Sequence, residues 1–427
     1  MKTFVFEDYG FDAKTGIANF KYSYEDGMSF EEKIFYSPPG EYEERALERA
    51  LFLAFLLVGT SYFKTFPTPN VRFAKGRIDK WQADFLNKVY GEGLSQFAFE
   101  NELSRSDLAQ FSATTETVEF EPVAYSGQGR LVLESGGKDS LLTSVLLKNQ
   151  DDDFQPWYVS YDTAKHPNIL DDLGTPLLTA TRSIDIEKIT HAMENGGLNG
   201  HVPVTYILAS LAVIQAVLTG RSEVLVSIAH EGEEPHAMIG DLPVTHQWSK
   251  TWEAEQLFAE YVERYVSSDI KVGSPLRSYS ELRVAELFYQ YAWSDYGRRF
   301  SSCNRANYLQ GADNAELKWC GECPKCANAY LLFAPFVDYE ELKSLFNGQD
   351  LFKKESLQHT FKGLLGIDGI MKPFECVGEI DELRYAYHAA VNKGGYGTLS
   401  FEVPESDFDY MREYLSQSWA SDSIRLL

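Results

Sequence analysis

Apolar and polar positions alternate through the first part of the chain, and Gly and Asp residues separate the alternating stretches. Three stretches are short and rich in aromatic side chains, and each predicts a strand: residues 3–6, 17–24 and 33–36. Residues 43–58 instead predict a helix, which we expect to end at Gly59. The Ser-Gly-Gln-Gly run at 126–129 suits a boundary. The pattern therefore predicts an N-terminal α+β domain over residues 1–125.

From residue 130 onward, short uniformly apolar runs alternate with longer helical stretches. Strands are predicted at residues 131–134, 156–161 and 223–228. One of the intervening helices follows Pro203 and ends near Thr219. This alternation is typical of an α/β fold with a parallel sheet and right-handed crossovers. We assign this α/β domain to residues 128–335, and a mainly helical C-terminal region to residues 336–427.

Composition and charge narrow the class of protein. A chain of 427 residues is long enough for two or three domains, and 44% hydrophobic and 14% aromatic residues supply cores for them. The net charge of −24 repels polyanions and argues against a nucleic-acid substrate. The longest apolar runs, 51–58 and 206–218, are shorter than a bilayer requires, and Met1 begins no apolar leader. We expect a cytoplasmic protein without membrane contact; the sequence leaves its oligomeric state open.

The junction at residues 131–140 carries the most specific chemistry. The apolar run 131–133 has the composition of a buried parallel strand, and apolar residues recur at helical spacing from residue 141. Between them lies a glycine pair, Gly136 and Gly137. At such a junction unpaired backbone N–H groups and the positive end of the helix dipole converge, and glycine permits close approach of the backbone. The junction therefore predicts a phosphate-binding loop, with a spacing that differs from the Walker loop.

This loop resembles the S-G-G-x-D-S loop of the PP-loop superfamily, the N-type ATP pyrophosphatases. All six positions match: Ser135, Gly136, Gly137, Lys138, Asp139 and Ser140. The resemblance implies a parallel-sheet PP-loop domain, similar to the adenine nucleotide alpha hydrolases. It also implies that the serines and glycines grip the diphosphate of ATP, that Lys138 adds positive charge, and that Asp139 engages Mg²⁺ or orients the loop. ATP would be split to AMP and diphosphate after a substrate oxygen attacks the α-phosphate.

Four of the five cysteines lie within 24 residues: Cys303, Cys320, Cys323 and Cys326. Three of them share one tight turn, and the fourth is free to complete a tetrahedron. Four thiolates predict a structural zinc site, because no coordination position remains for water or substrate. An iron–sulfur cluster also accepts four thiolates and is the alternative. A disulfide is disfavoured in a cytoplasmic protein.

Longer strings extend the likeness beyond the superfamily and resemble the MurL family. They are residues 61–64, 199–205, 246–250, 300–305, 319–321 and 372–379. MurL proteins are ATP-dependent epimerases of UDP-N-acetylmuramoyl-L-alanyl-L-glutamate, a precursor of peptidoglycan. The resemblance implies that the terminal L-glutamate becomes D-glutamate through an acyl-adenylate. Such activation is chemically reasonable, because the α-proton beside a free carboxylate is almost impossible to remove.

The resemblance also yields candidate residues for this reaction. His201, His246 and Lys250 lie in shared strings and are candidates for bases or phosphate contacts, although a histidine is more often a structural hydrogen-bonding residue. Cys376 is a candidate base, and its alternative is an inert buried cysteine. Candidates for the substrate carboxylates or the UDP diphosphate are Arg277, Arg283 and Arg305.

One segment departs from the family pattern. Residues 229–236 follow a predicted strand where substrate should bind, but lack the expected arginine and serine. The acidic run 231–234 predicts an exposed loop that repels an anionic dipeptide. Two alternatives to the epimerase therefore stay open. One is an ATP-dependent ligase or amidating enzyme that adenylates another carboxylate, and the other is a non-catalytic ATP-binding zinc module.

Overall fold

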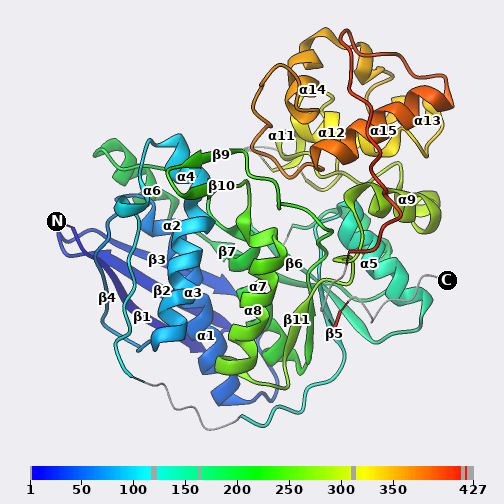
Figure 1. Cartoon of the computed structure of the whole chain (residues 1–427). Coiled ribbons are helices and arrows are strands. Elements are labelled where there is room, and N and C mark those ends of the chain that lie inside the picture. Colours follow the sequence, from blue (N-terminus) through cyan, green and yellow to red (C-terminus); the bar gives the residue numbers. More distant parts are fainter. Residues whose placement is uncertain (1, 117–122, 162–164, 309–313, 415–418, 421–427) are drawn as a thin grey trace.

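The computed structural model describes residues 2–116, 123–161, 165–308, 314–414 and 419–420. Its centre is one nine-stranded sheet, with helices on both faces (Figure 1). In spatial order the strands are β11 (Lys271–Gly273), β8 (Glu223–Leu225), β5 (Arg130–Leu133), β6 (Phe154–Ser160), β7 (Leu178–Ser183), β3 (Ser29–Phe35), β2 (Ile17–Tyr24), β1 (Phe4–Asp12) and β4 (Val71–Phe73). A separate hairpin consists of β9 (Ala237–Ile239) and β10 (Leu242–Val244).

The sheet is mostly parallel, as the alternating pattern predicts. Neighbouring strands are parallel from β11 through β7 and antiparallel from β7 to β1, and β4 is parallel to β1. The fold class is therefore α/β. Because β3 pairs with β7, the sheet crosses the expected boundary at residue 125. The division into 1–125, 128–335 and 336–427 stays a prediction.

Helices cover both faces of the sheet. One face packs against α1 (Glu44–Val58), α3 (Lys80–Gly91), α7 (Val204–Thr219) and α8 (Trp252–Tyr261). The other packs against α5 (Lys138–Asn149), α9 (Glu281–Tyr291) and α12 (Pro324–Phe333). Further helices are α2 (Thr60–Phe63), α4 (Ser95–Glu100), α6 (Ile186–Glu194), α10 (Trp293–Tyr296), α11 (Asn304–Asn307), α13 (Tyr339–Leu345), α14 (Gln358–Leu364) and α15 (Ile380–Lys393). The last three gather with α12 beyond α9, as expected for a helical C-terminal region (Figure 1).

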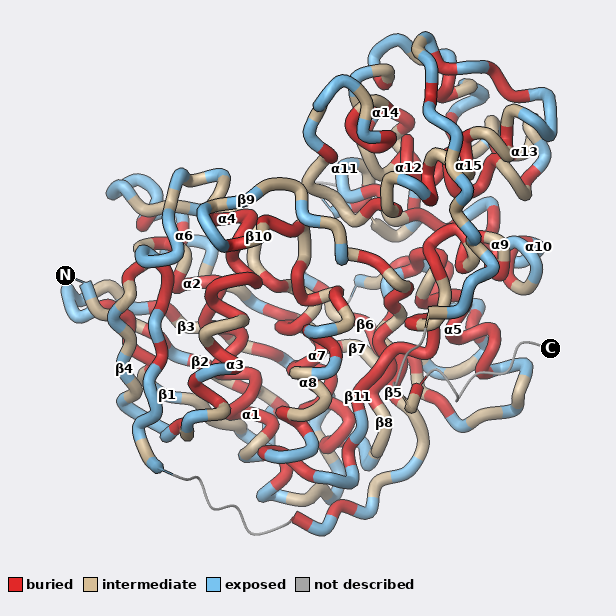
Figure 2. Tube along the Cα trace, in the orientation of Figure 1, coloured by how far each residue is buried: buried red, intermediate tan, exposed pale blue. Residues whose placement is uncertain are grey.

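Each face of the sheet has its own hydrophobic core, and strand alternation divides β5 between the two. Leu131 packs in the core beneath α1 and α7, and Val132 packs in the core beneath α5 and α9. A strand buried on both faces reads as a continuous apolar run, which is the pattern of residues 131–133. Figure 2 shows buried chain on both sides of the strands. Strand β5 is therefore packed on both faces up to the loop that follows it.

The helix predicted at residues 43–58 is confirmed as α1, and Gly59 is its C-cap, as expected. Gly59 adopts a right-handed helical conformation, with φ of −52°, and α2 follows at once. A Cβ at this position would lie 2.8 Å from Tyr90 Oη and 2.9 Å from a ring carbon of Phe6, so glycine serves close aromatic packing here. By length and composition the segment Glu44–Phe63 could cross a membrane, yet 89% of its apolar window is buried inside the structure.

A buried ion pair joins the antiparallel and parallel parts of the sheet. Arg182 on β7 donates from Nε to Glu32 Oε1 on β3 at 2.6 Å, and both side chains are almost inaccessible. The hydroxyl of Tyr62 donates to Glu32 Oε2 at 2.8 Å, and Arg182 also donates to Ser61 Oγ at 3.0 Å. Every charge in this junction is therefore paired and hydrogen-bonded, as buried charges require.

We predict that Arg182→Met lowers the free energy of unfolding by about 3–5 kcal/mol, because it leaves Glu32 buried without its cation. Urea denaturation measures this change. Arg72→Met is the matched control, since Arg72 pairs with Glu25 at 3.6 Å on the half-exposed surface, where a loss below about 1 kcal/mol is expected. Equal losses in the two variants would contradict this view of the junction.

Candidate active site

The phosphate loop connects β5 to α5 through a single left-handed turn. Gly136 has φ of +77°, and Gly137 caps the first turn of α5 in an extended conformation. A Cβ on Gly136 would lie 2.5 Å from Leu317 Cδ1. Both the backbone conformation and the lack of space therefore demand glycine at this position. The turn brings the chain to the N-terminus of α5, the end of a helix where an anion is favoured.

Hydroxyl groups hold the loop in shape. The backbone N–H of Ser135 donates to Ser140 Oγ at 3.3 Å, and that of Gly137 donates to Ser135 Oγ at 3.4 Å. The Tyr308 hydroxyl donates to the Ser135 carbonyl at 3.0 Å. The loop is therefore ordered by its own serines before any ligand binds.

An acidic residue, Glu134, lies directly beneath the loop. Its side chain is 6% exposed and accepts a hydrogen bond from Ser144 Oγ. Burial raises the pKa of Glu134 to about 7, although hydrogen bonds from Ser144, Ser140 and the loop backbone oppose this rise. The carboxyl is therefore close to half-protonated at neutral pH, next to the loop that the sequence predicts to bind phosphate.

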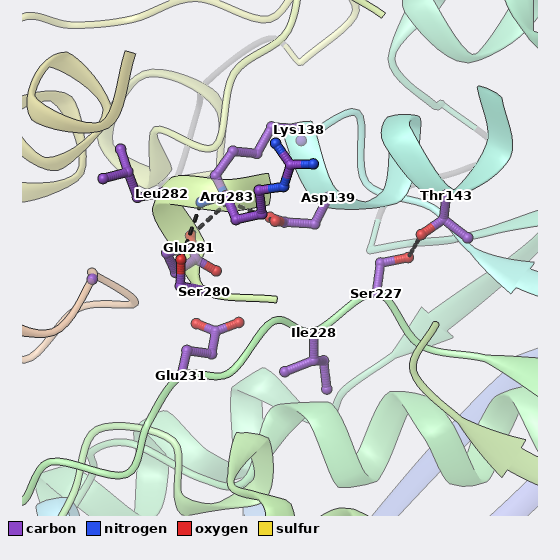
Figure 3. Close-up of polar contacts among 12 residues, drawn as sticks. Lys138, Asp139, Thr143, Ser227, Ile228, Glu231, Ser280, Glu281, Leu282 and Arg283 are labelled. Carbon is purple, nitrogen blue, oxygen red and sulfur yellow. Dashed lines mark hydrogen bonds and ion pairs between the residues drawn. The ribbon is translucent and has the colours of Figure 1, made fainter. Parts of the chain in front are cut away.

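The carboxylates of Asp139, Glu231 and Glu281 lie around Lys138 at the start of α5 (Figure 3). Lys138 donates from Nζ to Asp139 at 2.6 Å and to Glu281 at 2.5 Å. Burial disfavours the Lys138 ammonium, but the two carboxylates outweigh burial and hold its pKa above the ordinary value. Burial raises the pKa of Glu281 to about 8; Lys138 opposes this rise, and Asp139 and Glu231 add to it. Asp139 and Glu281 thus share the Lys138 ammonium, whereas Glu231 pairs with Lys250.

The acidic run 231–234 is not the exposed loop that was predicted, and it does not stand as free negative charge. Glu231 is 5% exposed, and the Lys250 ammonium lies 3.2 Å from its carboxylate. Glu234 pairs with Lys372 at 2.8 Å and accepts from the backbone N–H of Ile380. These ion pairs remove the repulsion that the sequence predicts for an anionic substrate.

A cavity of about 250 Å³ opens at the carboxyl ends of β5 and β8, the edge of a parallel sheet where ligands bind. Of the candidate residues, those that line it are Ser135, Gly137, Lys138, Asp139, Ser140, Lys250 and Cys376. Glu134, Glu231 and Glu281 line it too. Residue types alone did not single out these three acids, although a glutamate directly after a buried strand was a signal for Glu134.

The two candidate histidines lie outside the lining of this cavity. Their ring centroids are 4.8 Å apart, and His246 Nδ1 lies 2.7 Å from Gln96 Oε1. Burial lowers the pKa of His201 and of His246 to about 3, so both rings are neutral. As they stand, the histidines connect the segments 199–205 and 246–250 to each other.

The three candidate arginines also lie outside the lining of the cavity. Arg277 is 2% exposed; its Nε donates to Glu255 at 2.8 Å, and its Nη1 donates to the carbonyls of Ala229 and Lys250. Arg283 pairs with Glu286 within α9. Arg305 is exposed on α11.

The four predicted cysteines converge on one point. All four sulfur atoms lie within 4.8 Å of one another, and three Sγ–Sγ distances fall between 3.5 and 3.7 Å. Tetrahedral zinc with bonds of about 2.3 Å needs sulfur separations of about 3.8 Å. The backbone N–H of Gly321 donates to Cys326 Sγ, and that of Glu322 donates to Cys320 Sγ. The donor set fits a metal such as zinc.

The cysteine cluster supports the walls of the cavity. Ser301, two residues before Cys303, donates its backbone N–H to the Gly136 carbonyl at 3.4 Å. On α12, which begins directly after Cys323, Asn328 accepts a hydrogen bond from the Gly378 backbone near Cys376. A metal at the cluster would therefore stabilise both the phosphate loop and the Cys376 segment.

Comparison with known proteins identifies the family. The family model of the MurL N-terminal domain matches residues 1–274, and that of the MurL C-terminal domain matches residues 299–399. The chain belongs to the MurL family. The cavity combines both MurL domains, since the phosphate loop and Lys250 fall in the first match, and Lys325 and Cys376 in the second.

Individual MurL relatives resemble the chain along most of its length. A protein of Xanthomonas oryzae is 33% identical over 394 residues, which cover 90% of this chain and 85% of the relative. A protein of Salinispora tropica is 34% identical, with 93% and 86% covered, and one of Micromonospora is 32% identical, with 90% and 85% covered. Each relative is named UDP-N-acetyl-alpha-D-muramoyl-L-alanyl-L-glutamate epimerase. Epimerases are a class of isomerase, so the names of these relatives place them among the isomerases.

We predict that the purified protein contains about one zinc ion per chain, measured by elemental analysis. Cys323→Ser should lose the metal, because three thiolates and a hydroxyl bind zinc poorly. Cys376→Ser is the matched control and should keep it, since Cys376 lies outside the cluster. Iron and inorganic sulfide in the preparation would instead support the iron–sulfur alternative.

We predict that the KM for ATP rises as the pH increases through about 7, where Glu134 ionises and its charge repels the phosphates. Below this pH the carboxyl is protonated and neutral, so the repulsion disappears. Glu134→Gln should flatten the profile, whereas Glu355→Gln, at an exposed glutamate, should reproduce the wild-type profile. A Glu134→Gln profile that matches the wild type would refute the role of this carboxyl.

Proposed function

We propose that this MurL protein converts the terminal L-glutamate of UDP-N-acetylmuramoyl-L-alanyl-L-glutamate to D-glutamate through an acyl-adenylate, releasing AMP and diphosphate. The substrate is proposed from the names of three relatives at 32–34% identity. The observation that carries the mechanism is the cavity, in which a phosphate-binding loop faces a lysine and a thiol. The reaction supplies a peptidoglycan precursor, and its nucleotide-linked substrate suits the cytoplasm.

The chemistry explains why an epimerase would consume ATP. Removing the α-proton beside a free carboxylate would create a dianion, so an ordinary base cannot do it. Transfer of AMP to the carboxylate creates an electron-poor acyl group, and its α-proton becomes acidic enough for a side chain to remove. Hydrolysis of the adenylate restores the carboxylate after the centre has inverted.

The loop residues have distinct proposed roles. Ser135, Gly137 and Ser140 contact the diphosphate, and Gly136 provides the turn that aims the backbone N–H groups. Lys138 adds positive charge at the floor of the cavity. Asp139 lines the cavity and offers a carboxylate ligand that suits Mg²⁺, which would neutralise charge on the phosphates.

Lys250 and Cys376 are the proposed acid–base pair. Burial disfavours the Lys250 ammonium, but Cys376, Glu231 and Asp139 outweigh burial and hold its pKa well above the ordinary value. The lysine therefore stays protonated and can serve as the acid that delivers a proton to the carbanion, while the Cys376 sulfur serves as the base that removes one. This assignment gives His201 and His246 a supporting role, because both are neutral and lie outside the cavity lining.

Two further roles complete the proposal. A zinc ion in the cysteine cluster is structural, because four thiolates leave no position open for substrate. Arg283 and Arg305 stay candidates for the charges of the substrate outside the cavity, and Arg277 supports the loop after β8 through the Ala229 carbonyl.

The direct test is incubation of the protein with the UDP-linked dipeptide, ATP and Mg²⁺. We expect AMP and diphosphate, with D-glutamate recovered after hydrolysis of the peptide and no requirement for ammonia. A requirement for a nitrogen donor would support a ligase instead, and absence of AMP would support a non-catalytic module. Either outcome would overturn the proposal.

A variant pair tests the loop itself. Gly136→Val should lower AMP formation at least about 100-fold, as expected when positioning of the reacting phosphate fails. Gly196→Ala is the matched control, since Gly196 has φ of +83° but open space around its Cβ position. It should lose some stability through backbone strain and keep its activity. Equal activity in Gly136→Val and the wild type would refute the proposed loop.

A further inference from the structure

A second hollow, of about 690 Å³, opens next to the cavity at the carboxyl ends of β8 and β11. Its lining includes His230, Trp252, Arg277, Arg412 and Tyr414. Its volume lies within the usual range for small-molecule sites. No role proposed for the residues of the first cavity involves this second hollow.

The two sites share a wall. Glu231 and Lys250 line the first cavity, whereas their close neighbours His230 and Trp252 line the second hollow. His230 is in extended pairing with Ser280, so the side chains of residues 230 and 231 point to opposite sides of the chain. Arg277 connects the two segments that form this wall, because its Nη1 donates to the carbonyls of Ala229 and Lys250. A ligand long enough to pass the wall would occupy both sites.

The hollow offers aromatic surface and charged groups of both signs. The rings of His230 and Tyr414 stack with centroids 3.6 Å apart and an angle of 11° between their planes. Burial lowers the pKa of His230 to about 4, so the stacked pair is neutral. Arg412 lies over the Tyr414 ring, and the carboxylates of Glu233 and Glu413 also line the hollow. Arg412 provides donors and the two carboxylates provide acceptors, whereas the Arg277 guanidinium is already held by Glu255 and two backbone carbonyls.

This chemistry matches a nucleoside better than a dicarboxylate. A nucleobase stacks on aromatic faces, its carbonyl oxygens accept hydrogen bonds from arginine, and ribose hydroxyls donate to carboxylates. A glutamate residue would meet as many acids as bases. We propose that the second hollow binds the uridine end of the nucleotide-linked substrate while its glutamate lies in the first cavity. This inference rests on the proposed function for the identity of the nucleoside.

The test uses uridine monophosphate as the probe and calorimetry on the full chain, with a non-hydrolysable ATP analogue saturating the phosphate loop. We expect binding to the wild type, and a loss of at least about tenfold in affinity for Tyr414→Ala, because the stacked His230–Tyr414 pair that forms the aromatic wall of the hollow is broken. Tyr414→Phe keeps the ring and should bind within about twofold of the wild type. Arg412→Ala should also bind more weakly, whereas Arg298→Ala, at an arginine paired with Glu341 outside the hollow, should bind as the wild type does.

The outcomes separate this inference from the proposed function. Equal affinity of all variants, no binding to the wild type, or displacement of the probe by the ATP analogue would overturn the uridine site and leave the epimerase proposal intact. Weaker binding by both Tyr414→Ala and Arg412→Ala would establish the site even if no D-glutamate forms. Urea denaturation of each variant confirms that a loss of binding is not a loss of folding.

Discussion

The left-handed turn at Gly136 is the constraint on which the site depends. It allows the chain to leave a strand buried on both faces and begin a helix within a few residues. Its carbonyl accepts a hydrogen bond from Ser301, and Leu317 occupies the space that a side chain would need. Both contacts come from the segment that carries the cysteine cluster. The loop at residues 134–137 and the cysteine cluster are therefore parts of one packed unit.

Charge pairing in the cavity resolves an apparent conflict in the sequence. A chain with net charge −24 is a poor host for ATP and an anionic dipeptide. At the site, however, Glu281 is held against Lys138, and Glu231 is held against Lys250. For the charge of the site, the local ion pairs therefore matter more than the net charge of the whole chain.

Much of this arrangement could be predicted from local patterns. The strand at 17–24, the helix after Pro203 and the loop between β5 and α5 follow from periodicity and from glycine placement. Other parts could not be predicted, because they depend on pairing between segments that are far apart in the sequence. β7 has the polar sequence Leu-Thr-Ala-Thr-Arg-Ser, and it is a strand because β6 and β3 pair with it on either side. Glu231 and Glu281 join Asp139 only through the tertiary fold, so no spacing in the sequence singles them out.

The central claim is that the substrate carboxylate attacks the α-phosphate of ATP. The most direct measurement supplies the UDP-linked dipeptide with isotopically heavy oxygen in its glutamate carboxylates and analyses the released AMP by mass spectrometry. An acyl-adenylate that water opens at the carbonyl carbon leaves one heavy oxygen on the phosphorus of AMP, and this is the predicted result. AMP without the label, or ADP in its place, would contradict the account.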